Sequence, residues 1–239
     1  MTRRLTRLFT ALLFVTFTYA GAAARQGGGA QELIARGNER YARAEYEAAI
    51  KAYSLVPADA GEAYAQSLYN IGVCRFELWQ TEEAARMYRL AVEARGRRYP
   101  KASYALGVAL EELGRASEAK ESYARAATVG GYAPAHYKLG MIAEREGDLG
   151  RAATHFREAV RRSKGKFPAS HNNLGVMLAR VGHLDEAERE FEAALSESGG
   201  TFAEARHNLG LCRTLLAAGR AGGGVASLRV AAADDGFSR

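Results

Sequence analysis

The sequence has few of the residues that build covalently closed or metal-held structures. Its 239 residues include two cysteines, five histidines, four prolines and one tryptophan. Two cysteines are too few for a disulfide-rich scaffold. After residue 24 there is no apolar run of the roughly 20 residues that a membrane-spanning helix needs. We therefore do not expect the rest of the chain to span a bilayer.

Catalytic motifs are also missing. There is no Gly-x-Ser-x-Gly elbow and no His-Glu-x-x-His pair. Gly222, Gly223 and Gly224 do not form a phosphate loop, because no strand pattern precedes them and no Lys-Ser/Thr follows. The sequence predicts no enzyme, no small-molecule substrate and no cofactor. An enzyme or metal-binding protein stays open as the alternative of a different class.

Charge gives no reason to expect a nucleic-acid partner. The formal net charge is +6. Three of the positive charges, Arg3, Arg4 and Arg7, lie within the first 24 residues, which contain no acid. The small excess that remains does not have the size or clustering of a nucleic-acid-binding domain.

Residues 1–24 have the pattern of an export signal. The three arginines precede an apolar stretch, Leu8 to Phe17, and small residues at 20–24 offer two Ala-x-Ala-like cleavage sites. This pattern predicts export to a periplasm or to the outside of the cell after cleavage. The alternative is an inner-membrane anchor formed by an uncleaved segment at residues 5–24.

The remaining sequence is a repeat, marked by glycines at steps of 33 or 35 residues. They are Gly37, Gly72, Gly107, Gly140, Gly175 and Gly210. In the first five units a small residue follows twelve positions later, and a large ring follows four positions after that. The rings are Tyr53, Tyr88, Tyr123, Phe156 and Phe191, and the last unit has Leu228 in that place. Steps of four and three residues place these side chains on one face of a helix.

Each unit therefore predicts a helix, a tight turn, a second helix and a loop. The first helices are expected at 30–43, 66–78, 101–113, 134–146, 169–181 and 204–217. Their partners are expected at 45–56, 81–94, 116–128, 149–163, 184–197 and 221–233. Glycine, or Ala44 and Trp79 in the first two units, occupies the turn inside each pair, where a left-handed residue is often required.

At these residues the sequence resembles the tetratricopeptide repeat family, whose period and pattern of small and aromatic positions it shares. The closest matches to the pattern are "NLGVMLARVGHLDEAEREFEAAL" (173–195) and "GNERYARAEYEAAIKAY" (37–53). The resemblance implies an all-α, right-handed superhelical solenoid of about six antiparallel helix pairs. The domain plan is a signal at 1–24, a linker at 25–29, the solenoid at 30–236 and a tail at 237–239. Its units start near 30, 65, 100, 133, 168 and 203, and the last is degenerate.

Repeat phase also decides the expected state of the histidines and cysteines. His136 and His171 occupy the same place in adjacent units, but no acid or cysteine joins them there, so we expect no metal site. Cys74 and Cys212 share a place four units apart, too far for a disulfide. We expect both to be buried thiols.

The resemblance implies that the first helix of each pair lines a concave groove that binds protein. Its predicted residues lie three before and one after the unit glycine. They are Ile34, Asn38, Tyr69, Val73, Tyr104, Val108, Tyr137, Met141, Asn172, Val176 and His207. If Tyr69, Tyr104 and Tyr137 form a recognition ladder, we expect them to be partly exposed. The other interpretation is that these rings pack between helices.

Two peptide sites of the family match only in part. A carboxylate clamp would use Asn38, Asn70 and Lys101, but Ile34 and Ala105 replace two of its cations. A second type uses an asparagine two residues before each unit glycine to grip a peptide backbone. Asn70, Asn173 and Asn208 fit that ladder, and Ala35, Ala105 and Lys138 interrupt it.

The sequence therefore predicts a non-catalytic scaffold or adaptor that binds a protein or peptide segment in an exported compartment. A homo-oligomer is possible. The alternative is a self-associating assembly factor, or a membrane-anchored spacer of envelope machinery.

Overall fold

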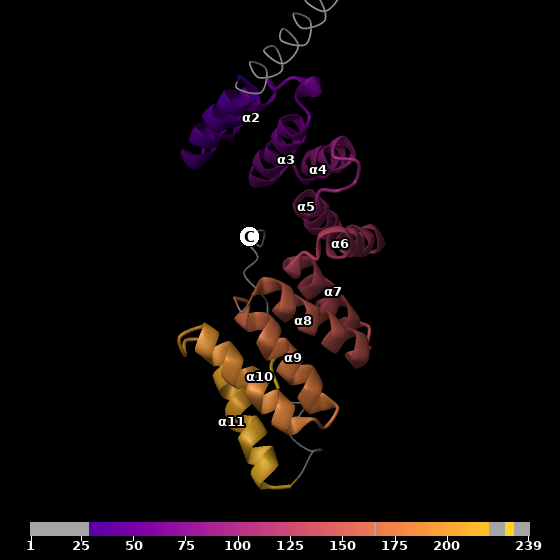
Figure 1. Ribbon diagram of the computed structural model, residues 1–239, viewed down its shortest axis with the longest axis vertical. Helices are drawn as coiled ribbons and strands as arrows, with labels where there is room; N and C mark the ends of the chain where they lie inside the picture. Colours follow the sequence, from indigo (N-terminus) through magenta and orange to yellow (C-terminus); the bar gives the residue numbers. More distant parts are fainter. Residues whose placement is uncertain (1–28, 165, 220–227, 232–239) are drawn as a thin grey trace, which may run out of the picture. The chain divides into compact units, whose positions relative to one another are not determined.

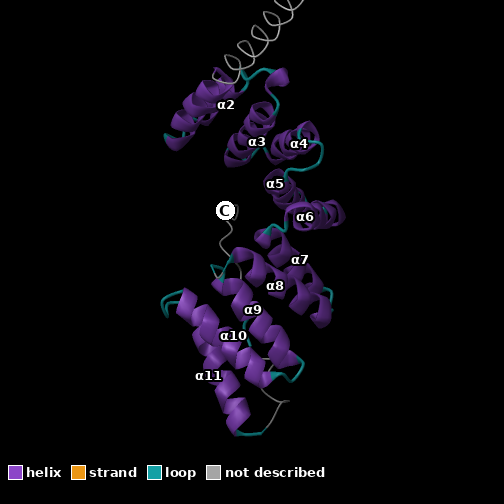
Figure 2. Cartoon of the chain, viewed as in Figure 1, coloured by secondary structure: helices purple, strands orange, loops and turns teal. Residues whose placement is uncertain are grey.

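A computed structural model describes residues 29–164, 166–219 and 228–231. The chain divides into two compact units, residues up to Arg97 and residues from Arg98. Helices and loops make up the described part of both units, with no strand among those residues (Figure 2). The all-α class predicted from the repeat is confirmed.

The first unit contains two helix pairs. A helix over residues 29–42 is followed by α2 (Tyr46–Tyr53), the short 3-10 helix η1 (Ala58–Ala60), α3 (Glu62–Glu77) and α4 (Thr81–Ala94). Its core contains Ile34, Tyr53, Ile71 and Cys74.

The second unit continues the same alternation (Figure 1). Its helices are α5 (Pro100–Glu112), α6 (Ala116–Gly130), α7 (Ala133–Arg145), α8 (Leu149–Ser163), α9 (Pro168–Arg180), α10 (Leu184–Glu197) and α11 (Ala203–Ala217). Each of α5, α7 and α9 packs mainly on the helix that follows it, and α9 also contacts α11, the first helix of the next pair. The helices α4, α8 and α10 have the predicted bounds, because the period places them between fixed turns.

The unit glycines allow the two helices of a pair to approach closely. A Cβ atom added to Gly140 would lie 2.7 Å from the Phe156 ring, and one added to Gly175 would lie 2.7 Å from the Phe191 ring. Both rings are fully buried. The recurring glycine and the ring sixteen residues later are thus one contact, made once in each complete pair.

The turns inside the pairs use left-handed backbone as predicted. Gly114, Gly147 and Gly182 have φ values of 73°, 79° and 89°. Ala44 and Trp79 adopt φ values of 57° and 59° at the equivalent places, despite their side chains. Position in the repeat, rather than residue type, sets the backbone here.

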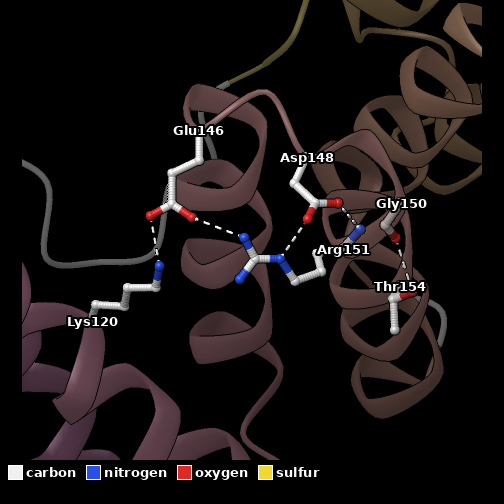
Figure 3. Close-up of polar contacts among 6 residues, drawn as sticks. All are labelled: Lys120, Glu146, Asp148, Gly150, Arg151 and Thr154. Atoms are coloured by element: carbon white, nitrogen blue, oxygen red, sulfur yellow. Dashed lines mark hydrogen bonds and ion pairs between the residues drawn. The ribbon is translucent and has the colours of Figure 1, made fainter.

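Ion pairs join neighbouring helix pairs in the second unit (Figure 3). Glu146, which follows α7, accepts from Lys120 of α6 at 2.6 Å and from Arg151 of α8 at 3.3 Å. Arg151 also pairs with Asp148 at 2.7 Å, and Asp148 caps α8 by accepting from the Arg151 backbone N–H at 2.8 Å. These side chains are substantially exposed, so the contacts align adjacent helices more than they stabilise the fold.

The sixth pair departs from the prediction. A second helix was expected at 221–233, but the described residues of that range, 228–231, have no helical structure. A Cβ atom on Gly210 would meet nothing within 4 Å, unlike one on Gly140 or Gly175. The physical reason lies in the described residues: the N–H and C=O groups of Arg229 and Ala231 bond to Asn208 and Asn173 and not within a helix.

The two cysteines are free and buried, as predicted. Burial raises the pKa of Cys74 to about 12, which makes its thiol unreactive at neutral pH. Within the described ranges no helix is both long and apolar enough to cross a bilayer. The predicted export signal at 1–24 lies outside the described residues and stays a prediction.

Candidate functional site

Four polar side chains from three consecutive first helices lie together in the second unit. They are Tyr137 of α7, Asn172 and Asn173 of α9, and Asn208 of α11. We call this group the asparagine face. Each member lies two or three residues before a unit glycine, so the repeat itself brings them together.

The asparagine face holds the main chain of the segment at residues 228–231. The N–H of Arg229 donates to Asn208 Oδ1 at 2.8 Å, and its C=O accepts from Asn208 Nδ2 at 2.8 Å and Asn172 Nδ2 at 3.0 Å. The N–H of Ala231 donates to Asn173 Oδ1 at 2.8 Å, and its C=O accepts from Asn173 Nδ2 at 2.9 Å. The Tyr137 hydroxyl also donates to the Ala231 carbonyl.

This pattern reproduces the pairing of a β-strand with a neighbour. One side-chain amide offers a donor and an acceptor to the N–H and C=O of a single residue, and the next amide does the same two residues further along. Residues i and i+2 of an extended chain present their polar groups on the same side. The contacts therefore read main chain, which every peptide has, and not a particular side chain.

Bonds among the face's own side chains fix their orientation. Asn208 Nδ2 donates to Asn172 Oδ1 at 2.8 Å, and Asn172 Nδ2 donates to Asn173 Oδ1 at 3.0 Å. Asn173 Nδ2 also lies 3.2 Å from the Tyr137 hydroxyl. The three asparagines are fully buried, and buried amides need such partners.

The side chains of residues 228–231 differ in how far they are buried. Leu228 and Ala231 are 5% and 3% exposed and belong to the core cluster that includes Val176. Val230 is half-buried against the same cluster, whereas Arg229 is exposed. The site thus encloses an apolar residue and, three positions later, a small one.

The predicted groove residues of the second unit have mixed roles. Tyr137 and Asn172 belong to the asparagine face. Met141 is half-buried, with its sulfur 3.4 Å from Asn173 Nδ2, and Val176 is buried beside it in the core cluster. Val108 is buried and His207 is exposed.

The expected partial exposure of the tyrosine ladder is wrong. Tyr69, Tyr104 and Tyr137 are 5%, 0% and 3% exposed. The Tyr69 ring packs on Tyr88 in the first unit, and the Tyr104 ring packs on Tyr123 in the second. These rings fill space between helices, as the alternative interpretation had it, and Tyr137 also reaches the segment through its hydroxyl.

In the described part of the first unit, no extended segment is bonded to the predicted groove residues. Ile34 is buried and Val73 is half-buried. Asn38 is exposed and accepts from Tyr53 at 2.8 Å and from Asn70 at 3.4 Å.

The sequence analysis named all four members of the asparagine face, but in two separate sets, the groove residues and the interrupted asparagine ladder. Asn173 and Asn208 match the family's asparagine ladder that bonds a peptide backbone. One unit earlier, the ladder position is occupied by Lys138, which makes an ion pair with Glu111 at 3.3 Å. The structure uses Tyr137 there instead, one residue earlier in the helix. The adjacent pair Asn172 and Asn173 belongs to both sets at once and is the sequence feature that connects them.

The histidines are engaged with other partners. His136 Nδ1 lies 3.4 Å from His155 Nδ1, and burial together with nearby positive charge lowers the pKa of both rings. His171 bonds Glu190 at 2.6 Å and Glu197 at 3.1 Å. Burial alone lowers the His171 pKa, but these two carboxylates outweigh it and raise the pKa overall. Over the described part of the chain, no three such side chains are arranged so that they could hold a metal ion.

Solved structures with a similar fold share low sequence identity with this chain. PilF of Pseudomonas aeruginosa has a TM-score of 0.62 and 18% identity, over 81% of this chain and 86% of that one. MamA of Desulfovibrio magneticus has a TM-score of 0.55 and 18% identity, over 73% of this chain and 98% of that one. YrrB, described as a TPR protein with an unusual peptide-binding site, has a TM-score of 0.53 and 23% identity, over 64% of this chain and 78% of that one.

No curated protein matches the chain in sequence. The family model described as "Tetratricopeptide repeat" matches residues 75–134, 104–167 and 137–208, which together cover more than half of the chain. With the helix pairs, the glycine–ring contacts and the asparagine face, this match establishes that the chain belongs to the tetratricopeptide repeat family.

Proposed function

We propose that this protein is a non-catalytic scaffold that binds an extended segment of another protein on the asparagine face. The observation that carries the proposal is the paired bonding of residues 229 and 231 by Asn208 and Asn173. A surface that bonds the main chain at alternate residues is suited to an extended peptide, whatever its sequence at the exposed positions.

The similarity to YrrB supports this mode, since that protein's description names a peptide-binding site. At 23% identity the likeness concerns the fold, so the peptide mode rests on the geometry of this chain. Buried, mutually bonded amides lose little freedom when a segment arrives, and such preorganisation favours binding.

Peptide selection tests the proposal. Peptides selected from a displayed library on the purified chain should bind a variant with Asn173→Ala and Asn208→Ala at least tenfold more weakly, about 1.4 kcal/mol. Gln31→Ala, an exposed change in the first unit, is the matched control and should leave affinity unchanged. Peptides that bind the double variant as tightly as the wild type would contradict this site.

We also propose that the protein works in an exported compartment, most simply a bacterial periplasm. The support is the pattern of residues 1–24 alone. Sequencing the N-terminus of protein recovered from that compartment should find it between Gly21 and Arg25. Intact Met1 in the membrane fraction would instead favour the anchored spacer.

A further inference from the structure

We propose that residues 228–231 are a tethered occupant of the asparagine face, which an external segment must displace before it can bind. The inference rests on the proposed function and adds its regulation and the pattern of the ligand. Eight residues, 220–227, separate Gly219 from this segment in the sequence, and in the structure of this single chain the segment lies on the asparagine face.

The segment is held as a ligand would be held. Both polar main-chain groups of Arg229 and of Ala231 are bonded to side chains of the face. The bonds reach across 21 and 58 positions of sequence, so they are tertiary contacts and not a local turn. Leu228 and Ala231 are enclosed, and the Arg229 side chain is exposed.

Main-chain recognition is what makes the occupant replaceable. None of the hydrogen bonds uses a side chain of the segment, so another extended chain can make the same bonds. The enclosed positions limit the choice to a segment with an apolar residue and a small residue three positions later. The position of Arg229, directly after the apolar residue, is open to solvent, so we expect it to accept any side chain.

A tethered occupant weakens external binding by a predictable amount. Short tethers give effective concentrations on the order of millimolar. The apparent dissociation constant of an external peptide rises by the inverse of the fraction of molecules whose site is open. An occupant of moderate intrinsic affinity therefore reduces external affinity about tenfold, enough to gate binding without blocking it.

Substitutions of Arg229 distinguish the contribution of its main-chain N–H from that of its side chain. Arg229→Pro removes the N–H that Asn208 accepts and should release the segment, whereas Arg229→Ala removes only an exposed side chain and should leave it bound. Ala231→Pro acts in the same way on the Asn173 contact and serves as a second release variant. All three are made in the full chain, and melting curves show which of them are folded.

The probe is a fluorescent peptide of residues 225–234, VASLRVAAAD, read by anisotropy. Arg229→Pro or Ala231→Pro should bind it about tenfold more tightly than the wild type, and Arg229→Ala should match the wild type. Residue-resolved hydrogen exchange supplies a readout without a ligand. The amides of residues 229 and 231 should be protected in the wild type, and protection should be lost in Asn173→Ala with Asn208→Ala.

The outcomes separate the two proposals. Unprotected amides, with the probe bound equally by the wild type and both proline variants, would overturn the tethered occupant and leave peptide binding standing. Protected amides with no probe binding by any variant would make the segment a fixed part of the fold, and would overturn both. If diluting the protein lowers its molecular mass in solution from dimer to monomer and also removes the amide protection, the occupant comes from a second copy. That result would overturn the tethered occupant.

Discussion

At the scale of single residues, the contact between unit glycine and ring is the strictest requirement of the repeat. Gly140→Ala would place a Cβ 2.7 Å from the Phe156 ring, whereas Gly210→Ala meets nothing within 4 Å. Overpacking should cost the first variant about 1–3 kcal/mol of unfolding free energy. Better helix propensity should make the second neutral or more stable by up to about 1 kcal/mol. Urea unfolding of both variants checks this, and equal losses would refute the contact.

His171 gives the fold a dependence on pH. Its pKa is raised above the ordinary value of about 6.5 by Glu190 and Glu197, which outweigh burial. A histidine whose pKa is higher in the folded state stabilises the folded protein fully at pH values below its unfolded pKa. This stabilisation is lost as the pH rises through the folded pKa. The stability advantage of the wild type over His171→Gln should therefore shrink as the pH rises above about 6.5 and through the raised folded pKa. Melts across that range test it, and a constant difference would show that the imidazolium contributes nothing.

The sequence predicts which side chains lie on the binding face better than it predicts how exposed they are. Tyr137 and Asn172 were placed on the binding face because repeat phase fixes the direction of a helical side chain. For Tyr69 and Tyr104 the sequence left two interpretations open, because repeat phase does not tell whether a neighbouring helix covers a ring, and the structure supports packing between helices. Asn173 and Asn208 matched the ladder, but only the structure shows what bonds them.

At the scale of elements, turns are set by position in the repeat. Ala44 has φ 57° where Gly147 has φ 79° in a later pair. A left-handed conformation strains any residue with a Cβ by about 1 kcal/mol or more. Ala44→Gly should therefore raise the free energy of unfolding by up to about 1 kcal/mol, and Gly147→Ala should lower it by about the same amount. Opposite signs in denaturant melts are the expected result, and a loss in both would mean that the turns are not equivalent.

Helix positions were largely predictable and the last element was not. Bounds followed from the glycine period, the turn residues and the prolines, each of which has a local cause. The expected helix at 221–233 relied on Leu228 and Ala231 fitting the repeat spacing. Both residues are buried, but in an extended segment, because a spacing that suits one helix face can also arise from a strand-like ligand with two enclosed positions.

At the scale of the whole molecule, the chain is a set of helix pairs whose second unit carries a built site. Binding there would need no catalytic group, since the asparagine face offers only amides and one hydroxyl. The central claim is that this face recognises the main chain of an extended segment.

The most direct test changes only the peptide and uses one protein chain, the Arg229→Pro variant, for every measurement. The 225–234 peptide is N-methylated at the positions of Arg229 and Ala231, whose N–H groups the face accepts, or at Val230, whose N–H makes no bond to the face in the described segment. Calorimetry with the Arg229→Pro chain should show at least a tenfold loss, about 1.4 kcal/mol, for methylation at 229 and 231, and little change for methylation at 230. Equal affinities for the unmodified peptide and the two methylated peptides would contradict main-chain recognition by the asparagine face.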